Sequence, residues 1–196
     1  MDLTCLITLN DILPDKHSDL AICVIPANRE AAAQLEVTRE NIILYANRCG
    51  ADYIELTGDK APEWPMSNKY RLKQVIEKYE RTLYLDCDVV VKPDAPNIFQ
   101  NSALDKVCFV YEWKIIKDSY ENLFSGLQIE RSKVILRYPS LARNNRAIQP
   151  NGGVMLFPRD LAHRYSQPPG PYPKFWCFDQ DYLLLNLEDD EFETID

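Results

Sequence analysis

The sequence predicts an α/β fold in which a mainly parallel sheet is flanked by helices. Short runs rich in β-branched and aromatic residues alternate with segments of helical spacing, in units of about thirty residues. The 196-residue chain is 46% hydrophobic and 27% charged, which is ordinary for a globular protein. Two acids directly follow one of the apolar runs, where open sheets bind their ligands. We expect a single domain spanning 1–196, large enough to bury a substantial core.

The first part of the chain predicts a strand, a helix and a second strand. The first strand is the β-rich run 20–27, which Pro26 interrupts. The second strand is 51–56. Between them Gly50 is suited to cap the end of a helix. Four apolar residues at near-helical spacing support this helix within 29–50: Leu35, Ile42, Ala46 and Cys49.

A second helix is expected after Ser67, whose side chain is suited to an N-cap. Its buried face is predicted from four apolar residues at positions i, i+3, i+4 and i+7: Leu72, Val75, Ile76 and Tyr79. Two helices and three strands in this order are typical of a parallel α/β sheet.

The run RTLYLDCDVVV, residues 81–91, places Asp86 and Asp88 inside apolar sequence. If one strand continues through the run, both carboxylates share a face about 7 Å apart. Such carboxylates cost several kcal/mol each unless a cation compensates them. If the strand instead ends at Leu85, both acids belong to a solvated turn. The apolar VVV that follows argues against full solvation and favours a functional site.

The remaining strands are expected at 106–113 and at 152–158, the second of which ends at Pro158. The Pro-, Tyr- and Trp-rich segment 159–178 is interpreted as an irregular loop. A helix is expected to begin at DQDYLLLNLEDD, because acids in a first turn suit the helix dipole. The N-terminal run LTCLITL is interpreted as an edge strand.

Charge and cysteine content exclude several classes of function. The net charge is −8, from 22 basic and 30 acidic residues without a basic cluster, so nucleic-acid binding is not expected. The cysteines form no CxxC pair, and the two histidines lie at no ligand spacing, so no zinc site is expected. Free buried thiols are expected instead: Cys5, Cys23, Cys49, Cys87, Cys108 and Cys177.

Five segments carry a resemblance to a known family, in that family's order. They are LAICVIPAN, NIILYANRCGADYIEL, NKYRLKQVIEKYERTLYLDCDVVV, NGGVMLFPRD and FDQDYLLLN. The third resembles the DxD motif of GT-A fold glycosyltransferases, with Lys69 seventeen positions before Asp86. The fourth is similar to their Asn-x-Gly segment and the fifth to their Asp-Gln helix start. The match is closest to family 8, the glycogenin and lipopolysaccharide galactosyltransferase type, and implies a Rossmann-like GT-A fold over most of 20–188.

The resemblance also bears on origin and location. Small GT-A domains of this size occur among large algal viruses, and the chain resembles them. No basic leader opens the chain and no apolar run approaches the length of a membrane span. We therefore expect a cytoplasmic protein, in the host-cell cytoplasm if it is viral.

The resemblance implies a metal-dependent hexosyltransferase. Its donor would be a nucleotide diphosphate sugar, in this family a UDP-sugar, and its acceptor a hydroxyl of a glycan or glycoprotein. Asp88 would bind Mn²⁺ or Mg²⁺ directly, while Asp86 would contact the ribose and the metal. Such cations accept few protein carboxylates together with phosphate oxygens, so the pair leaves room for a diphosphate.

The resemblance assigns the donor site to further segments. Lys69 would place a positive charge on the donor, with an exposed lysine at a helix start as the alternative. For Asn28 and Arg29 the alternative is a loop and helix cap, and for 151–153 a tight turn before a strand. The residues assigned to donor binding are Pro26, Ala27, Asn28, Arg29, Lys69, Asp86, Asn151, Gly152 and Gly153.

By the same resemblance Asp179 and Gln180 would be the catalytic residues near the reacting carbon. Ordinary chemistry of a helix N-terminus is the alternative. Asp181 is expected to face away, and Glu112 is a second candidate for the catalytic group. Four aromatic side chains could stack on sugar rings or simply pack: Trp64, Trp113, Tyr172 and Trp176.

The sequence departs from family 8 at one point. Those enzymes usually supply a further metal ligand, a His, from beyond the Asp-Gln helix. Neither His17 nor His163 occupies that position, and the sequence ends at Asp196. Either water and phosphate complete the metal site, or the chain is a truncated or N-terminal domain of a longer protein.

Three other functions are alternatives to glycosyl transfer. A sugar-phosphate nucleotidyltransferase has a similar sheet, but its first strand leads into a Gly-rich loop, and PANREA contains no glycine. The carboxylates of a glycosidase flank the scissile bond from opposite sides, whereas neighbours on one strand point the same way. A non-catalytic nucleotide-sugar binding module stays open.

Overall fold

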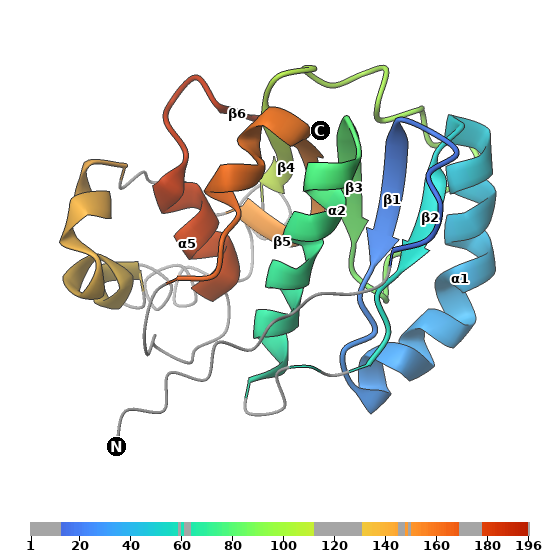
Figure 1. The fold of residues 1–196 in the computed structure, drawn as a ribbon, viewed down its shortest axis with the longest axis horizontal. Coiled ribbons are helices and arrows are strands. Elements are labelled where there is room, and N and C mark those ends of the chain that lie inside the picture. The colour runs from blue at the N-terminus through green and yellow to red at the C-terminus, as the bar shows by residue number, and fades with distance from the viewer. Residues whose placement is uncertain are drawn as a thin grey trace, which may run out of the picture.

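The computed structural model describes residues 13–58, 60, 64–111, 131–144, 148, 150–168 and 178–195. Six strands form one sheet in the order β2-β1-β3-β5-β4-β6 (Figure 1). Only β5 runs antiparallel to its neighbours. The predicted mainly parallel α/β sheet is therefore confirmed. The strands are β1 Leu20–Val24, β2 Asp52–Glu55, β3 Arg81–Leu85, β4 Val107–Tyr111, β5 Pro150–Pro158 and β6 Phe192–Ile195.

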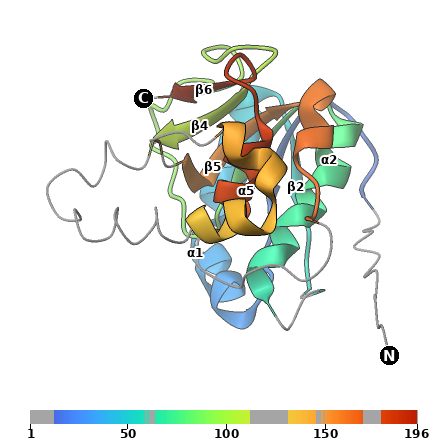
Figure 2. The same ribbon diagram turned by 90° about the vertical axis from the view of Figure 1, so that its left-hand side faces the viewer.

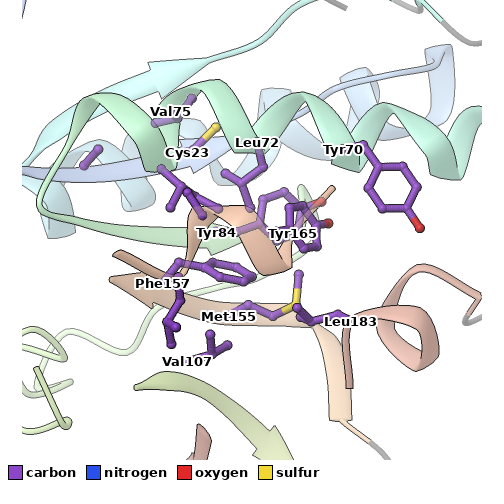
Figure 3. Close-up of a cluster of buried hydrophobic side chains, with 14 of the residues drawn as sticks. Cys23, Tyr70, Leu72, Val75, Tyr84, Val107, Met155, Phe157, Tyr165 and Leu183 are labelled. Carbon is purple, nitrogen blue, oxygen red and sulfur yellow. The ribbon is translucent and has the colours of Figure 1, made fainter. Parts of the chain in front are cut away.

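Helices cover both faces of this sheet, as Figure 2 shows for α1 and α2. Residues of β1 alternate between two cores, with Cys23 packing on the α2 side and Ile22 on the α1 side. Figure 3 shows the first core, in which Tyr84, Phe157 and Tyr165 lie below α2. The α-helices are α1 Arg29–Cys49, α2 Leu72–Lys78 and α5 Phe178–Asn186, and the 3₁₀ helices are η1 Pro65–Arg71, η2 Pro139–Asn144 and η3 Arg159–Arg164. Residues 131–137 are also helical.

The caps of α1 agree with its sequence. The side chain of Asn28 accepts a hydrogen bond from the N–H of Ala31 and starts the helix. Gly50 ends it in the left-handed conformation, with φ of 68°, and its N–H donates to the carbonyl of Asn47. All four apolar residues of the predicted stripe are buried. The predicted helix is confirmed.

Two local predictions are wrong. Ser67 is not an N-cap, because it lies inside η1 and its hydroxyl donates to the carbonyl of Trp64 at 2.8 Å. The four apolar residues after it are nevertheless buried as expected. Residues 159–164 form η3 rather than an irregular loop, with Leu161 and Ala162 packed into the core on the α2 side.

The sequence pattern gave no sign of β6. Its four residues, FETI, are mostly half-buried and only the first and last are apolar, so no apolar alternation marks it. The strand is stabilised by parallel pairing with β4 and by stacking of Phe192 on Phe109, with ring centroids 5.5 Å apart. Tertiary partners therefore form this strand where local sequence is neutral.

Several predictions lie outside the described residues, among them the N-terminal edge strand, Cys5 and Cys177. The other four cysteines are free and buried, as expected. None of the helices in the described part of the chain is both long and apolar enough to cross a membrane.

The left-handed conformation of Gly50 leads us to expect a loss of stability on substitution. A methyl group there meets no neighbour within 4 Å, so Gly50→Ala tests backbone strain alone. We expect the substitution to lower the free energy of unfolding by about 1 kcal/mol, measured by urea denaturation. Gly50→Asn should recover part of this loss, because Asn tolerates the left-handed region. Equal stability of Gly50→Ala and the wild type would contradict the assignment.

Candidate functional site

Asp86 and Asp88 lie in a turn at the carboxyl end of β3. The strand ends at Leu85, although the N–H of Asp86 still donates to the carbonyl of Gly153 on β5 at 2.8 Å. The N–H of Val89 then donates to the carbonyl of Asp86 at 3.1 Å and closes the turn. The interpretation of a strand that continues past the acids is therefore wrong. Hydration at the edge of the sheet spares the carboxylates most of their desolvation cost.

The turn is not fully solvated. This agrees with the prediction from the apolar VVV that follows it. Cys87, between the two acids, is buried. Val89 and Val91 are partly buried against the core on the α1 side. Apolar side chains thus anchor the turn while Asp88 is exposed.

Lys69 connects the turn to two other segments. Its ammonium nitrogen lies 3.1 Å from Oδ1 of Asp86 and 3.7 Å from Oδ2 of Asp179, and it donates to the carbonyl of Gly152 at 3.1 Å. The residue is only 8% exposed. The alternative of an exposed lysine is therefore wrong. A buried ammonium requires such partners, because its desolvation is otherwise costly.

Tyr84 contacts the same oxygen of Asp86, Oδ1, as Lys69 does. Its hydroxyl donates to Oδ1 of Asp86 at 2.5 Å. Burial, and then the neighbouring Asp86 carboxylate, raise the pKa of Tyr84 well above its usual range. The Lys69 ammonium also lies 5.2 Å from the centre of the Tyr84 ring. Two donors therefore fix the orientation of Asp86.

Gly152 and Gly153 lie inside β5, not in a tight turn before it, so that alternative is wrong. A Cβ on Gly152 would stand 2.6 Å from Oε1 of Gln180. A Cβ on Gly153 would stand 2.9 Å from Oδ2 of Asp86. The glycines are needed for close approach. The N–H of Gly153 also donates to the side chain of Asn151 at 2.8 Å.

Asp179 and Gln180 begin α5 and are both buried. The N–H of Gly152 donates to Oε1 of Gln180 at 2.8 Å. Neither carboxylate oxygen of Asp179 accepts a hydrogen bond of ordinary geometry from the described residues. Burial raises the pKa of Asp179. The positive charge of Lys69 counteracts this rise, and the negative charge of Asp86 adds to it. The side chains predicted to be catalytic therefore lie beside Lys69, at the buried end of the site.

Asp181, which is expected to face away from the catalytic side chains, pairs with Arg131. It is buried and accepts hydrogen bonds on Oδ1 from Nη2 of Arg131 at 2.7 Å and from Nε at 2.9 Å. Arg131 also donates to the carbonyl of Ile148 at 2.8 Å. It therefore ties the start of α5 to the residues before β5. Sequence reasoning missed Arg131, because no local pattern marks a partner fifty positions away.

A cavity of about 160 Å³ lies between the start of α1 and the acid turn. Pro26, which is buried, and Arg29, which is exposed, are not among its lining residues. The side-chain oxygen of Asn28 caps α1, so the alternative of a helix cap is correct for this atom. The lining residues are Ile25, Ala27, Asn28, Ala31, Gln34, Met66, Asn68, Lys69, Tyr84, Asp86, Cys87 and Asp88.

Some lining residues were not foreseen. Ala31 and Gln34 follow Asn28 at spacings of three residues along α1, so helical periodicity could have indicated them. Met66 and Asn68 belong to η1, which the sequence did not predict. Among the aromatic candidates, Trp64 packs edge-on against Phe178, with ring centroids 5.5 Å apart. Glu112, Trp113, Tyr172 and Trp176 lie outside the described residues.

The two acids fit a divalent cation that shares its coordination with a ligand. Within the described ranges, no group of three or more His, Cys, Asp or Glu side chains could hold a metal ion. Asp86 and Asp88 both line the cavity, and the side chain of Asp86 is 36% exposed. Carboxylates suit Mn²⁺ and Mg²⁺, and phosphate oxygens or water would complete the shell.

The chain has similarity to a solved structure. No family model and no curated protein matches the chain. The chain is similar to a structure described as a glycosyltransferase involved in the glycosylation of the major capsid of PBCV-1, with a TM-score of 0.45 and 16% sequence identity. The match covers 74% of this chain and 62% of that one, so the chain spans less than two thirds of the matched protein's length.

The burial of Asp179 gives a prediction on pH. Because its folded-state pKa is raised, the carboxyl group favours folding most below its ordinary pKa of about 4 and opposes folding as pH rises through the raised value. We expect the stability of Asp179→Asn, relative to wild type, to increase in urea denaturation as pH rises from about 4 through the raised pKa. Asp94→Asn, at an exposed acid, is the control and should show no such trend. A relative stability of Asp179→Asn that falls with pH would contradict the assignment.

Proposed function

We propose that the protein is a metal-dependent glycosyltransferase that moves a hexose from a UDP-sugar to a hydroxyl of a glycan or glycoprotein. One observation carries the proposal. Segments far apart in the sequence bring two carboxylates, a buried ammonium and two close-approach glycines to one edge of the sheet, beside a cavity. Ligands of open α/β sheets bind at this edge.

The acid turn would hold the donor diphosphate through Mn²⁺ or Mg²⁺. Asp88 is exposed and lines the cavity, so it can bind a cation directly. Asp86 is oriented by Lys69 and Tyr84 on Oδ1, which leaves the other side of its carboxylate for the cation or the ribose. The cation would supply Lewis-acid stabilisation of the leaving diphosphate.

Lys69 would act chiefly by positioning. Its ammonium aligns the Asp86 carboxylate, and it holds β5 through the carbonyl of Gly152. Ala27 and Asn28 line the same cavity at the end of β1 and would contact the nucleotide. The donor would then lie between α1 and the acid turn.

Asp179 and Gln180 would serve the transfer step. A carboxylate beside the anomeric carbon can accept the proton of an acceptor hydroxyl or stabilise an oxocarbenium-like state. Burial raises the pKa of Asp179, and Lys69, at 3.7 Å, counteracts this effect in favour of the ionised form that either role needs. Gln180 would assist by holding Gly152 against α5.

A non-catalytic nucleotide-sugar binding module is the second candidate. It is favoured by the burial of Asp179, which is 1% exposed and therefore meets a substrate only if neighbouring groups move. Binding would occur in both cases, and only turnover separates them.

The first prediction from this proposal concerns the metal. Asp88→Ala should weaken the calorimetric affinity for UDP in the presence of Mn²⁺ by tenfold or more, on the order expected for loss of a metal ligand, while the protein stays folded. Asp94→Ala removes an exposed acid that does not line the cavity and should bind like wild type. Unchanged affinity in Asp88→Ala would rule the metal role out.

The second prediction concerns the chemistry. Asp179→Asn should keep UDP and Mn²⁺ affinity near that of wild type but lower the turnover number on the order of a hundredfold or more. Normal turnover would leave Asp179 with only a helix N-terminal role. A wild-type protein that binds UDP-sugars tightly and transfers none would favour the binding module.

A further inference from the structure

The acid turn opens a long segment that has no regular structure of its own. Residues 86–106, between β3 and β4, contain no helix and no strand. Their backbone polar groups therefore need partners outside a sheet ladder. One face of α1 supplies these partners through side chains spaced three or four residues apart: Thr38, Asn41, Tyr45 and Arg48.

Two of these side chains bind the turn itself. The hydroxyl of Thr38, which is 4% exposed, donates to the carbonyl of Cys87 at 2.7 Å. This carbonyl belongs to the residue between the two acids. Asn41 donates to the carbonyl of Val91 at 2.8 Å and accepts from the N–H of Val91 at 2.7 Å. The Asn41 amide therefore pairs with the backbone as a neighbouring strand would.

The other two side chains bind further along the segment. The hydroxyl of Tyr45 donates to the carbonyl of Pro96 at 2.8 Å and accepts from the N–H of Ile98 at 3.1 Å. Arg48 donates to the carbonyl of Ala95 at 3.0 Å. Both of these contacts lie beyond Val91 in the sequence, so Tyr45 and Arg48 serve as internal references for Thr38 and Asn41.

Asp88 depends on its backbone for its position. Its side chain makes no hydrogen bond and no ion pair with any of the described residues, unlike Asp86. The place of its carboxylate is therefore set by the backbone, which Thr38 holds at Cys87, before Asp88, and Asn41 holds at Val91, after it. The same helix carries Ala31 and Gln34, which line the cavity opposite the acids.

We propose that Thr38 and Asn41 are positioning residues that hold the acid turn at the distance from α1 at which a metal-bound nucleoside diphosphate fits. The proposal rests on the proposed function. The helix α1 would thus position both sides of the site. Its first turns would lie beside the nucleotide, and its third and fourth turns would hold the segment that carries the carboxylates. Side chains that support metal ligands in this way typically change metal affinity by about 10- to 100-fold when they are removed.

The test compares variants that lose similar hydrogen bonds at different distances from the acids. Thr38→Val keeps the shape of the side chain and removes the hydroxyl, Thr38→Ser restores the hydroxyl, and Tyr45→Phe removes the distal one. We expect calorimetric affinity for UDP with Mn²⁺ to fall on the order of tenfold in Thr38→Val and Asn41→Ala. Thr38→Ser and Tyr45→Phe should bind like wild type. Equal losses in Thr38→Val and Tyr45→Phe, at matched stability in urea, would overturn the proposal.

A second readout needs no ligand. Amide hydrogen exchange at Val91, whose N–H is held by Asn41, should accelerate on the order of tenfold in Asn41→Ala and stay unchanged in Tyr45→Phe. Unchanged exchange at Val91 would overturn the inference whatever the binding result. If wild type binds neither Mn²⁺ nor UDP, the proposed function fails, and exchange alone decides whether α1 holds the turn. Faster exchange with unchanged affinity would also overturn the positioning role.

Discussion

The ion pairs of the buried Lys69 ammonium are the contacts on which the site depends. One cation compensates two carboxylates from different segments, and it also donates a hydrogen bond to the backbone of β5. Loss of one partner of a buried pair is typically destabilising by about 3–5 kcal/mol, because the remaining charge is left uncompensated. That range applies most directly to Asp179, which is fully buried, and less to Asp86, whose side chain is 36% exposed.

The order of the strands explains why these groups meet. Because β5 lies beside β3 and runs in the opposite direction, Gly152 and Gly153 come level with the acids that follow β3. Side chains at either position would collide with Gln180 or Asp86. At the point where backbone and charged groups approach most closely, the antiparallel strand β5 therefore carries two glycines. On the other side, α1 holds the acid turn by side-chain hydrogen bonds, so the turn is fixed from both faces of the sheet.

Local sequence was sufficient for the elements with strong periodicity. The strands near 20–27 and 51–56, the helix that ends at Gly50 and the start of α5 were all predicted, because each has a clear apolar period or cap. The end of β3 was left open between two alternatives. The last hydrogen bond of its ladder, from the N–H of Asp86 to Gly153, has a partner far away in the sequence, so local sequence could not choose between them.

The candidate site shows the same division. Lys69, Asp86, Gly152, Asp179 and Gln180 were all expected at one site, and the structure brings them together, although only through the family resemblance were they singled out. The pairing of Arg131 with Asp181, and the hydrogen bonds of Thr38 and Asn41, depend on tertiary distances that no spacing in the sequence encodes.

Release of nucleoside diphosphate from a panel of nucleotide-sugars tests the proposed activity most directly. The panel should be run with Mn²⁺ and with a chelator, in the presence of hydroxyl acceptors and of water alone. We expect UDP to be released from at least one UDP-hexose with Mn²⁺, to be released faster with an acceptor, and to fall to background with the chelator. Release that is insensitive to the chelator, or no release from any nucleotide-sugar by the folded protein, would contradict metal-dependent glycosyl transfer.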